Sequence, residues 1–154
     1  MGKVEKQLEA AGIILPKAPA SLAAYAPGVV SDKMVYTSGQ LPMVSGSLAY
    51  KGRLGENASV EEGYAAARQC AVNCLGVLKS LLGDLDRVIR VVKVTGFVNS
   101  TADFDGQPKV INGASELLQT VFGDAGVHAR SAVGVSSLPL GAMCEVEMIV
   151  EYHD

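Results

Sequence analysis

Residues 128–152, HARSAVGVSSLPLGAMCEVEMIVEY, contain an arginine and several carboxylates within two stretches of alternating side chains. Arg130 lies near the start of the first stretch and shares a face with Ala132 and Gly134. A guanidinium is a planar fork that can hold a carboxylate through two parallel hydrogen bonds. The small neighbours leave room for a ligand. The pattern predicts either a carboxylate pocket or an ordinary cross-strand ion pair with a Glu, which contributes at most about 1 kcal/mol.

The second stretch carries acids on one face. Glu145, Glu147 and Glu151 alternate with apolar residues between Cys144 and Val150, as in a strand with one face in a core. A carboxylate that is partly removed from water has a raised pKa and can handle protons near neutral pH. The alternative is a solvated surface. The Leu-Pro-Leu-Gly break between the two stretches predicts that they pair as a hairpin.

Other polar side chains lie at expected ends of elements. In TSGQLP, Ser38 offers a hydroxyl and Gly39 allows close backbone approach, although both residues also suit a turn. Tyr25, in a proline-flanked segment, is either an aromatic over a site or a packing residue. Asn112, before Gly113, either caps a helix or points its amide into a site.

Several kinds of chemistry are disfavoured. Cys70 and Cys74 are four residues apart and Cys144 is distant, so no CxxC motif occurs, and His128 and His153 show no ligand spacing. Buried cysteines that pack as small hydrophobes are the favoured interpretation. The motifs GxxxxGK[ST], GxGxxG, HExxH and GxSxG are missing from the sequence, which disfavours nucleotide-binding, zinc-protease and α/β-hydrolase functions.

Composition predicts one globular domain, residues 1–154. The 49% hydrophobic content of the 154 residues is enough for a core. The net charge of −3, with the 13 basic residues scattered, disfavours binding to nucleic acid. The odd cysteine count and the charged start MGKVEK, which does not resemble a secretory signal, favour a cytoplasmic setting. No apolar run approaches the roughly 20 residues that span a bilayer.

Periodicity divides the chain into helices and strands. Helices are expected at 3–11, between Ser59 and Gly83, and at 111–123. Strands are expected at 34–42, 45–55 and 87–100 and in the two stretches above. Ser59 with Glu62 is typical of a capping box.

The resulting order, β-β-α-β-α-β-β after a short N-terminal helix, predicts an α+β fold. Its two main helices would cover one face of a mixed sheet. Valines on both faces of 88–98 suggest that the open face is buried by oligomerisation, with a closed symmetric ring expected.

Together, the motifs AAYAPG, VYTSGQLP, LxxLxxLLG, FVNSTADF, VING and HARSAVGVSSLPLGAMCEVE resemble the Rid (reactive intermediate deaminase, YjgF/RidA) family, also labelled endoribonuclease L-PSP-like. The resemblance covers roughly residues 20–152, and the Arg-Ser-x-Val-x-Val-x-x-Leu-Pro block is its most specific part. The N-terminal extension, residues 1–19, and the segments GYAAAR and NGAS are similar to the longer subgroup of the family.

The resemblance implies a chorismate-mutase-like fold, assembled as a homotrimer with sites in clefts between subunits. It implies an enzyme that hydrolyses the C=N bond of 2-imino acids to 2-oxo acids and ammonia, without a metal or cofactor and without nucleic-acid or membrane partners. Arg130 would bind the substrate carboxylate and Glu145 would position the attacking water. The resemblance also assigns substrate binding to Tyr25, Ser38, Gly39, Asn112 and Ala132.

Two departures affect the expected site. Ala132 stands where many members have Cys, and Ala can substitute only if that position acts through its backbone carbonyl. The stretch 104–112 looks longer than in compact members, which predicts a reshaped pocket. Two other functions remain: a non-catalytic trimer that binds a carboxylate metabolite, and an RNA-cleaving or translation-inhibiting protein, which the acidic composition disfavours.

Overall fold

The computed structural model describes residues 2–18 and 24–154. Its helices are α1 (Lys3–Ala10), α2 (Val60–Leu82) and α3 (Gln107–Phe122). Its strands are β1 (Gly28–Ser31), β2 (Met34–Thr37), β3 (Met43–Val44), β4 (Ser47–Leu48), β5 (Val88–Asn99), β6 (Ala129–Val135) and β7 (Cys144–Tyr152). Five strands form a mixed sheet in the order β1-β2-β7-β5-β6, and β3 and β4 pair separately.

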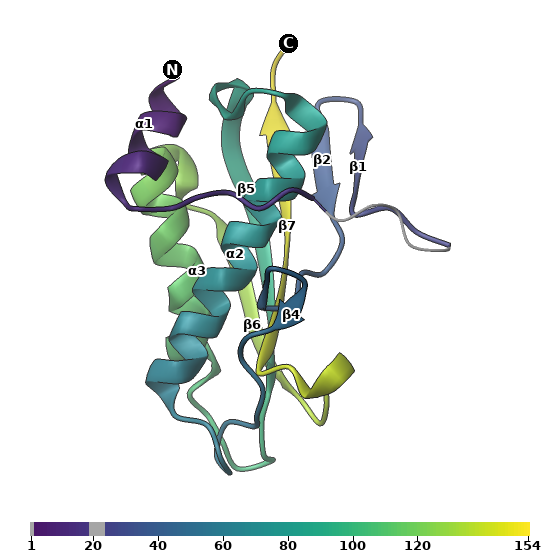
Figure 1. Cartoon of the computed structure of the whole chain (residues 1–154), viewed down its shortest axis with the longest axis vertical. Coiled ribbons are helices and arrows are strands. Elements are labelled where there is room, and N and C mark those ends of the chain that lie inside the picture. Colours follow the sequence, from purple (N-terminus) through teal and green to yellow (C-terminus); the bar gives the residue numbers. More distant parts are fainter. Residues whose placement is uncertain (1, 19–23) are drawn as a thin grey trace.

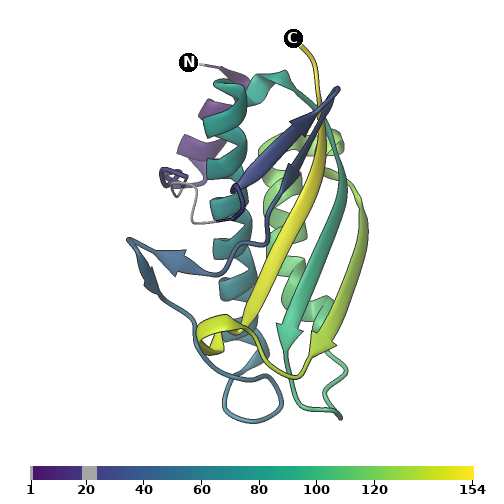
Figure 2. The same ribbon diagram turned by 90° about the vertical axis from the view of Figure 1, so that its right-hand side faces the viewer.

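The helices form one layer and the sheet another (Figure 1). Turning the molecule shows α2 and α3 on one side of the strands, while no α-helix of the described residues lies on the other side of the sheet (Figure 2). The predicted α+β architecture, with two helices on one face of a mixed sheet and a short N-terminal helix, is confirmed.

The predicted hairpin is wrong, because β6 and β7 do not pair. Both strands flank β5: β6 runs parallel to it and β7 runs antiparallel. The cause is α3, which carries the chain from the end of β5 back to its start, so that the next strand lies parallel to β5. The segment after β6 then crosses to the other side of β5 through a short 3₁₀ turn at Pro139–Gly141.

The prediction of one strand at 45–55 is also wrong, although the order β-β-α-β-α-β-β holds for the strands of the five-stranded sheet and the two main helices. That segment keeps only β4, because Gly46, Gly52 and Gly55 adopt φ of 82°, 144° and 89° and turn the chain. The second strand of the pair lies earlier, at Gly28–Ser31, and pairs with β2.

Helix α3 begins at Gln107 rather than at 111, with Pro108 in its first turn, where a missing N–H costs nothing. Asn112 therefore lies inside the helix, and its predicted role as a cap is wrong. Most of 104–112 is helix rather than loop. For α2 the prediction is confirmed: Glu62 N donates to Ser59 Oγ at 3.1 Å, and Ser59 N donates to Glu62 Oε1 at 3.0 Å.

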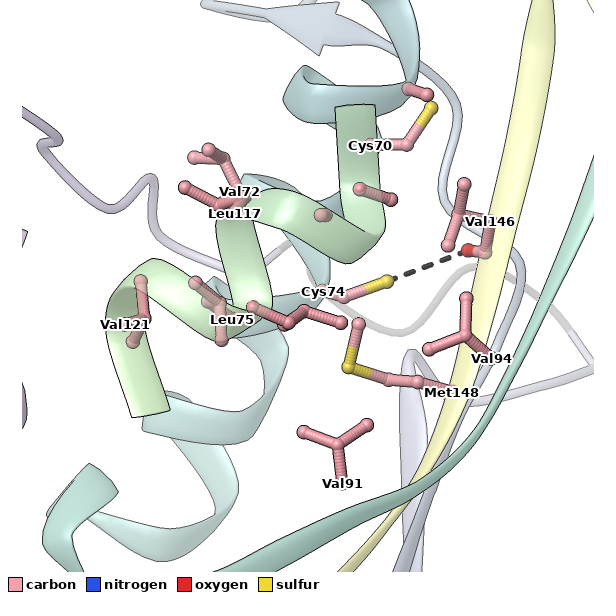
Figure 3. Close-up of a cluster of buried hydrophobic side chains, with 14 of the residues drawn as sticks. Cys70, Val72, Cys74, Leu75, Val91, Val94, Leu117, Val121, Val146 and Met148 are labelled. Carbon is pink, nitrogen blue, oxygen red and sulfur yellow. Dashed lines mark hydrogen bonds between the residues drawn. The ribbon is translucent and has the colours of Figure 1, made fainter. Parts of the chain in front are cut away.

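The core lies between the helices and the sheet. Side chains of β5 and β7 face those of α2 and α3 (Figure 3). Cys70, Cys74 and Cys144 are buried there as free thiols, so the packing interpretation is confirmed. Burial raises the pKa of Cys74 to about 12, and its thiol donates to the carbonyl of Val146 at 3.4 Å (Figure 3).

None of the helices within 2–18 and 24–154 combines the length and the hydropathy needed to cross a membrane.

Candidate functional site

Arg130 lies on the helix side of the sheet, held by α3. Its Nη1 donates to Asn112 Oδ1 at 2.8 Å and to Ser115 Oγ at 3.2 Å. Asn112 and Ser115 are three residues apart, so one face of α3 presents both acceptors to the guanidinium. Asn112 does not cap α3, and its amide oxygen accepts from Arg130, while the prediction that its amide points into a ligand site stays a prediction.

His128 extends this cluster. Its Nδ1 lies 2.6 Å from the Gly126 carbonyl oxygen, and its Nε2 lies 2.9 Å from Ser115 Oγ. Because a carbonyl only accepts, Nδ1 carries the proton of the neutral imidazole, and Nε2 accepts from the Ser115 hydroxyl. Ser115 Oγ in turn accepts from Arg130. The hydrogen bonds thus all favour one tautomer of His128.

The neutral form of His128 is also favoured by its surroundings. Burial lowers the pKa of His128 below its usual 6.5, and the nearby Arg130 guanidinium lowers it further, while the bond to Gly126 opposes this. The neutral ring accepts from the Ser115 hydroxyl, and so holds Ser115 in place as an acceptor for Arg130. His128 and Ser115 were not predicted from the sequence as site residues. Two signals pointed to them: the i, i+3 spacing of Asn112 and Ser115, and the place of His128 two residues before Arg130.

Glu145 forms a second cluster, on the open face of the sheet. Burial raises the pKa of this half-buried carboxyl, and the neighbouring Glu147 raises it further. A Cβ built on Gly39 would lie 2.5 Å from Glu145 Oε2, so a larger residue there would displace the carboxylate from its present position. The Glu145 carboxyl thus combines a raised pKa with backbone close beside it.

Ser38 precedes Gly39 and bonds to the two residues that follow Tyr25. Ser38 Oγ donates to the Ala26 carbonyl at 2.6 Å, and Ser38 N donates to the Pro27 carbonyl at 2.7 Å. These bonds fix the segment that follows Tyr25 against the end of β2. The Tyr25 side chain itself is 64% exposed.

Within one chain the two clusters are separate. Arg130 is level with Val94 and Met148, whose side chains are buried under the helices. Glu145 is level with Phe97, on the opposite face of the sheet. Strand β5 lies between the two residues and separates β6 from β7 by roughly 10 Å. The alternative prediction, a cross-strand ion pair between Arg130 and a Glu, is therefore wrong: no ion pair between described residues includes Arg130.

The two small residues of β6, Ala132 and Gly134, lie in different surroundings. Ala132 packs against the core. Gly134 lines a cavity of about 460 Å³ that lies at the far end of β6 from Arg130 and is bordered by Arg53. A larger cavity, of about 800 Å³, lies between α1, residues 12–18 and α2, away from every predicted site residue.

The arrangement presents a guanidinium held by neutral acceptors, a group that can bind anions, and a carboxyl with a raised pKa, a group that can transfer protons. Within the described ranges, no three His, Cys, Asp or Glu side chains are grouped closely enough to hold a metal ion.

The sequence of residues 5–152 matches the family described as "YjgF/chorismate_mutase-like, putative endoribonuclease". The chain belongs to the YjgF family. A relative in Trypanosoma cruzi, Protein TCP17, is 46% identical over 154 residues, which cover 99% of this chain and 96% of that protein. The 2-iminobutanoate/2-iminopropanoate deaminase of Rattus norvegicus is 31% identical over 133 residues, covering 86% of this chain and 83% of that enzyme.

Solved structures share this YjgF fold. The protein Atu1372 from Agrobacterium tumefaciens superposes with a TM-score of 0.92 at 45% identity, covering 98% of this chain and 93% of that chain. The YjgF gene product of E. coli superposes with a TM-score of 0.63 at 28% identity, covering 89% and 94%. The fold is thus common to relatives near and distant in sequence.

Proposed function

We propose that this YjgF-family protein hydrolyses 2-imino acids to 2-oxo acids and ammonia in a reducing, cytoplasmic setting. The observation that carries the proposal is the Arg130 guanidinium, which neutral acceptors orient on α3. No ion pair between described residues includes Arg130, so its charge is not neutralised by a neighbouring acid. Relatives named 2-iminobutanoate/2-iminopropanoate deaminase, such as the enzyme of Rattus norvegicus, support the reaction type.

The reaction needs a bound carboxylate, a water and a proton acceptor. Arg130 binds the carboxylate of the imino acid through two hydrogen bonds. Glu145 takes a proton from water as the oxygen adds to the C=N carbon, and passes that proton to the imine nitrogen. In the tetrahedral carbinolamine, the hydroxyl gives its proton to Glu145, which transfers it to the nitrogen. The C–N bond then breaks, ammonia leaves, the C=O of the 2-oxo acid forms and Glu145 is again a carboxylate. Positioning supplies part of the acceleration because the reactants are held in contact.

Because Arg130 and Glu145 lie on opposite faces of one chain, the proposal requires two copies. We place Arg130 of one subunit beside Glu145 of its neighbour, in a cleft of a homotrimer. The open sheet face supports such an assembly. Its apolar side chains Val29, Tyr36 and Val133 are 55%, 44% and 44% exposed. Exposed apolar side chains on one face are typical of a protein–protein contact surface.

A second function has one observation in its favour. The Arg130 cluster is complete within a single chain and does not include Glu145. A protein that only binds a carboxylate metabolite needs no more than this. RNA cleavage, which the family description mentions, has less support here because the net charge is −3.

The test is imine decay in a coupled dehydratase assay. We expect Arg130→Ala and Glu145→Gln each to lower the rate about a hundredfold, the usual range for a binding cation or a general base. Lys6→Ala is the control, because Lys6 is exposed on α1, away from both clusters and from the open sheet face. Rates of imine decay equal to that of wild type in both test variants would contradict the proposed function. A full rate in Glu145→Gln alone would favour the binding protein.

A further inference from the structure

The cavity of about 460 Å³ next to Arg53 is separate from both clusters described above. It lies at the end of β6 and beside the first turn of α3, and Ser100, Gln107 and Gly134 contribute to its wall. Gly134 is four residues beyond Arg130 on β6, which corresponds to roughly 13 Å along a strand. A volume of this size suits a small metabolite.

Arg53 is oriented by neutral groups alone. Its Nε donates to Asn99 Oδ1 at 3.2 Å, and its Nη2 donates to the carbonyl of Ser136. Asn99 is 6% exposed, and its amide nitrogen donates to the carbonyls of Gly52 and Ala142, which fixes its oxygen toward Arg53. No ion pair within 2–18 and 24–154 includes Arg53, so its charge is not neutralised by a carboxylate there.

The remaining donors of this guanidinium face the cavity's solvent. Nη1 makes no hydrogen bond with any described residue, and no buried polar atom in that part of the chain is left unpaired, so Nη1 is accessible to water. The edge formed by Nη1 and the second hydrogen of Nη2 has the geometry that binds the two oxygens of a carboxylate.

Gly134 keeps the floor of the cavity polar. A Cβ at this position would lie 2.6 Å from Ser100 Oγ and 2.8 Å from Gln107 Nε2, so a side chain would cover both atoms. Gln107 Nε2 uses one hydrogen on the Phe104 carbonyl and retains a second. Ser100 Oγ donates to the Val98 carbonyl and retains its lone pairs as acceptors.

We propose that this cavity binds a small carboxylate that bears a hydroxyl or amino group on the neighbouring carbon. The carboxylate lies on the open edge of Arg53, with Gln107 as a further donor. The neighbouring O–H or N–H donates to Ser100 Oγ. This site is independent of Arg130 and of the imine reaction, so it stands or falls without them.

The probe is L-lactate, titrated into the whole protein and followed by amide NMR shifts at Ser100, Gly134 and Ser136. We expect saturable shifts at these amides. Acetate, which lacks the hydroxyl, should bind several-fold more weakly, and inorganic phosphate should not compete at equal concentration. Arg53→Gln should weaken lactate binding about tenfold or more, since a charge-assisted pair of hydrogen bonds is lost.

Two further variants keep the test valid if Arg53→Gln fails to fold. Gly134→Ala retains the guanidinium but covers the floor, and should also weaken lactate binding about tenfold. Arg130→Gln should leave the shifts at Gly134 and Ser136 unchanged. The proposal fails if lactate moves only amides around Arg130. It also fails if lactate binds equally to wild type, Arg53→Gln and Gly134→Ala, or if phosphate displaces it.

Discussion

Arg130 is positioned by Asn112 and Ser115, and Ser115 is in turn bonded to His128. A guanidinium that is fixed by neutral acceptors retains its charge for a ligand and needs little reordering on binding. A partner carboxylate would have fixed the same side chain while neutralising it. The choice of neutral partners is therefore the residue-scale feature that most favours anion binding.

His128 predicts how stability depends on pH. Its pKa is lowered in the fold, so the unfolded chain binds more protons as the pH falls through the usual value of 6.5. The contribution of His128 is thus full above 6.5 and is lost below it. We expect the free energy of unfolding in urea to fall more between about pH 7.5 and pH 5.5 for wild type than for His128→Asn.

The comparison isolates His128, because Glu145 titrates in both proteins. The raised pKa of Glu145 acts in the opposite direction and stabilises the fold as the pH falls. His153→Asn, at an exposed site, is the matched control and should follow wild type. Identical pH profiles for wild type and His128→Asn would contradict the account.

The sequence pattern predicted which face of a strand each side chain takes, but not which residues it contacts. Alternation correctly placed Arg130 with Ala132 and Gly134 on one face, and Glu145 on a face opposite Cys144. It could not show that the two faces point in opposite directions in space, because that depends on the strand between them. Ser115 and His128 were missed since each looks ordinary until α3 packs beside β6.

At the scale of elements, caps, glycines and apolar runs predicted where a helix or strand lies when its limits depend on neighbouring residues in the sequence. The capping box of Ser59 and the glycine at 83 defined α2, and the valine-rich run defined β5. The pairing of β6 with β7 failed because the order of strands depends on the crossover through α3, not on the turn between them. Helix α3 began earlier because Pro108 suits a first turn.

Gly113 lies where α3 packs directly against the backbone of α2. A Cβ at this position would overlap the backbone carbonyl of Tyr64, so Gly113→Ala must push the helices apart. We expect a loss of about 2 kcal/mol or more in the free energy of unfolding, measured in urea. The exposed Thr120→Ala, also on α3, should change it by less than about 0.5 kcal/mol. Equal stability of the two variants would contradict this packing.

At the scale of the whole molecule, the open sheet face predicts self-association. Val133 lies on this face and is 44% exposed. We expect Val133→Glu to convert the assembly to smaller species in sedimentation velocity, because it places a charge in an apolar contact. Leu81→Glu is the control: Leu81 is 40% exposed but lies on α2, on the helix side. Unchanged sedimentation of Val133→Glu would show that this face is not the contact.

The central claim is that a site combines Arg130 of one subunit with Glu145 of another. It is tested most directly by refolding Arg130→Ala and Glu145→Gln chains together in equal amounts and measuring imine hydrolysis. Random mixing gives each interface a chance of about one quarter of receiving both intact residues, so we expect about a quarter of the wild-type rate. Each variant refolded alone should remain inactive. A mixture as inactive as its components would contradict a shared site.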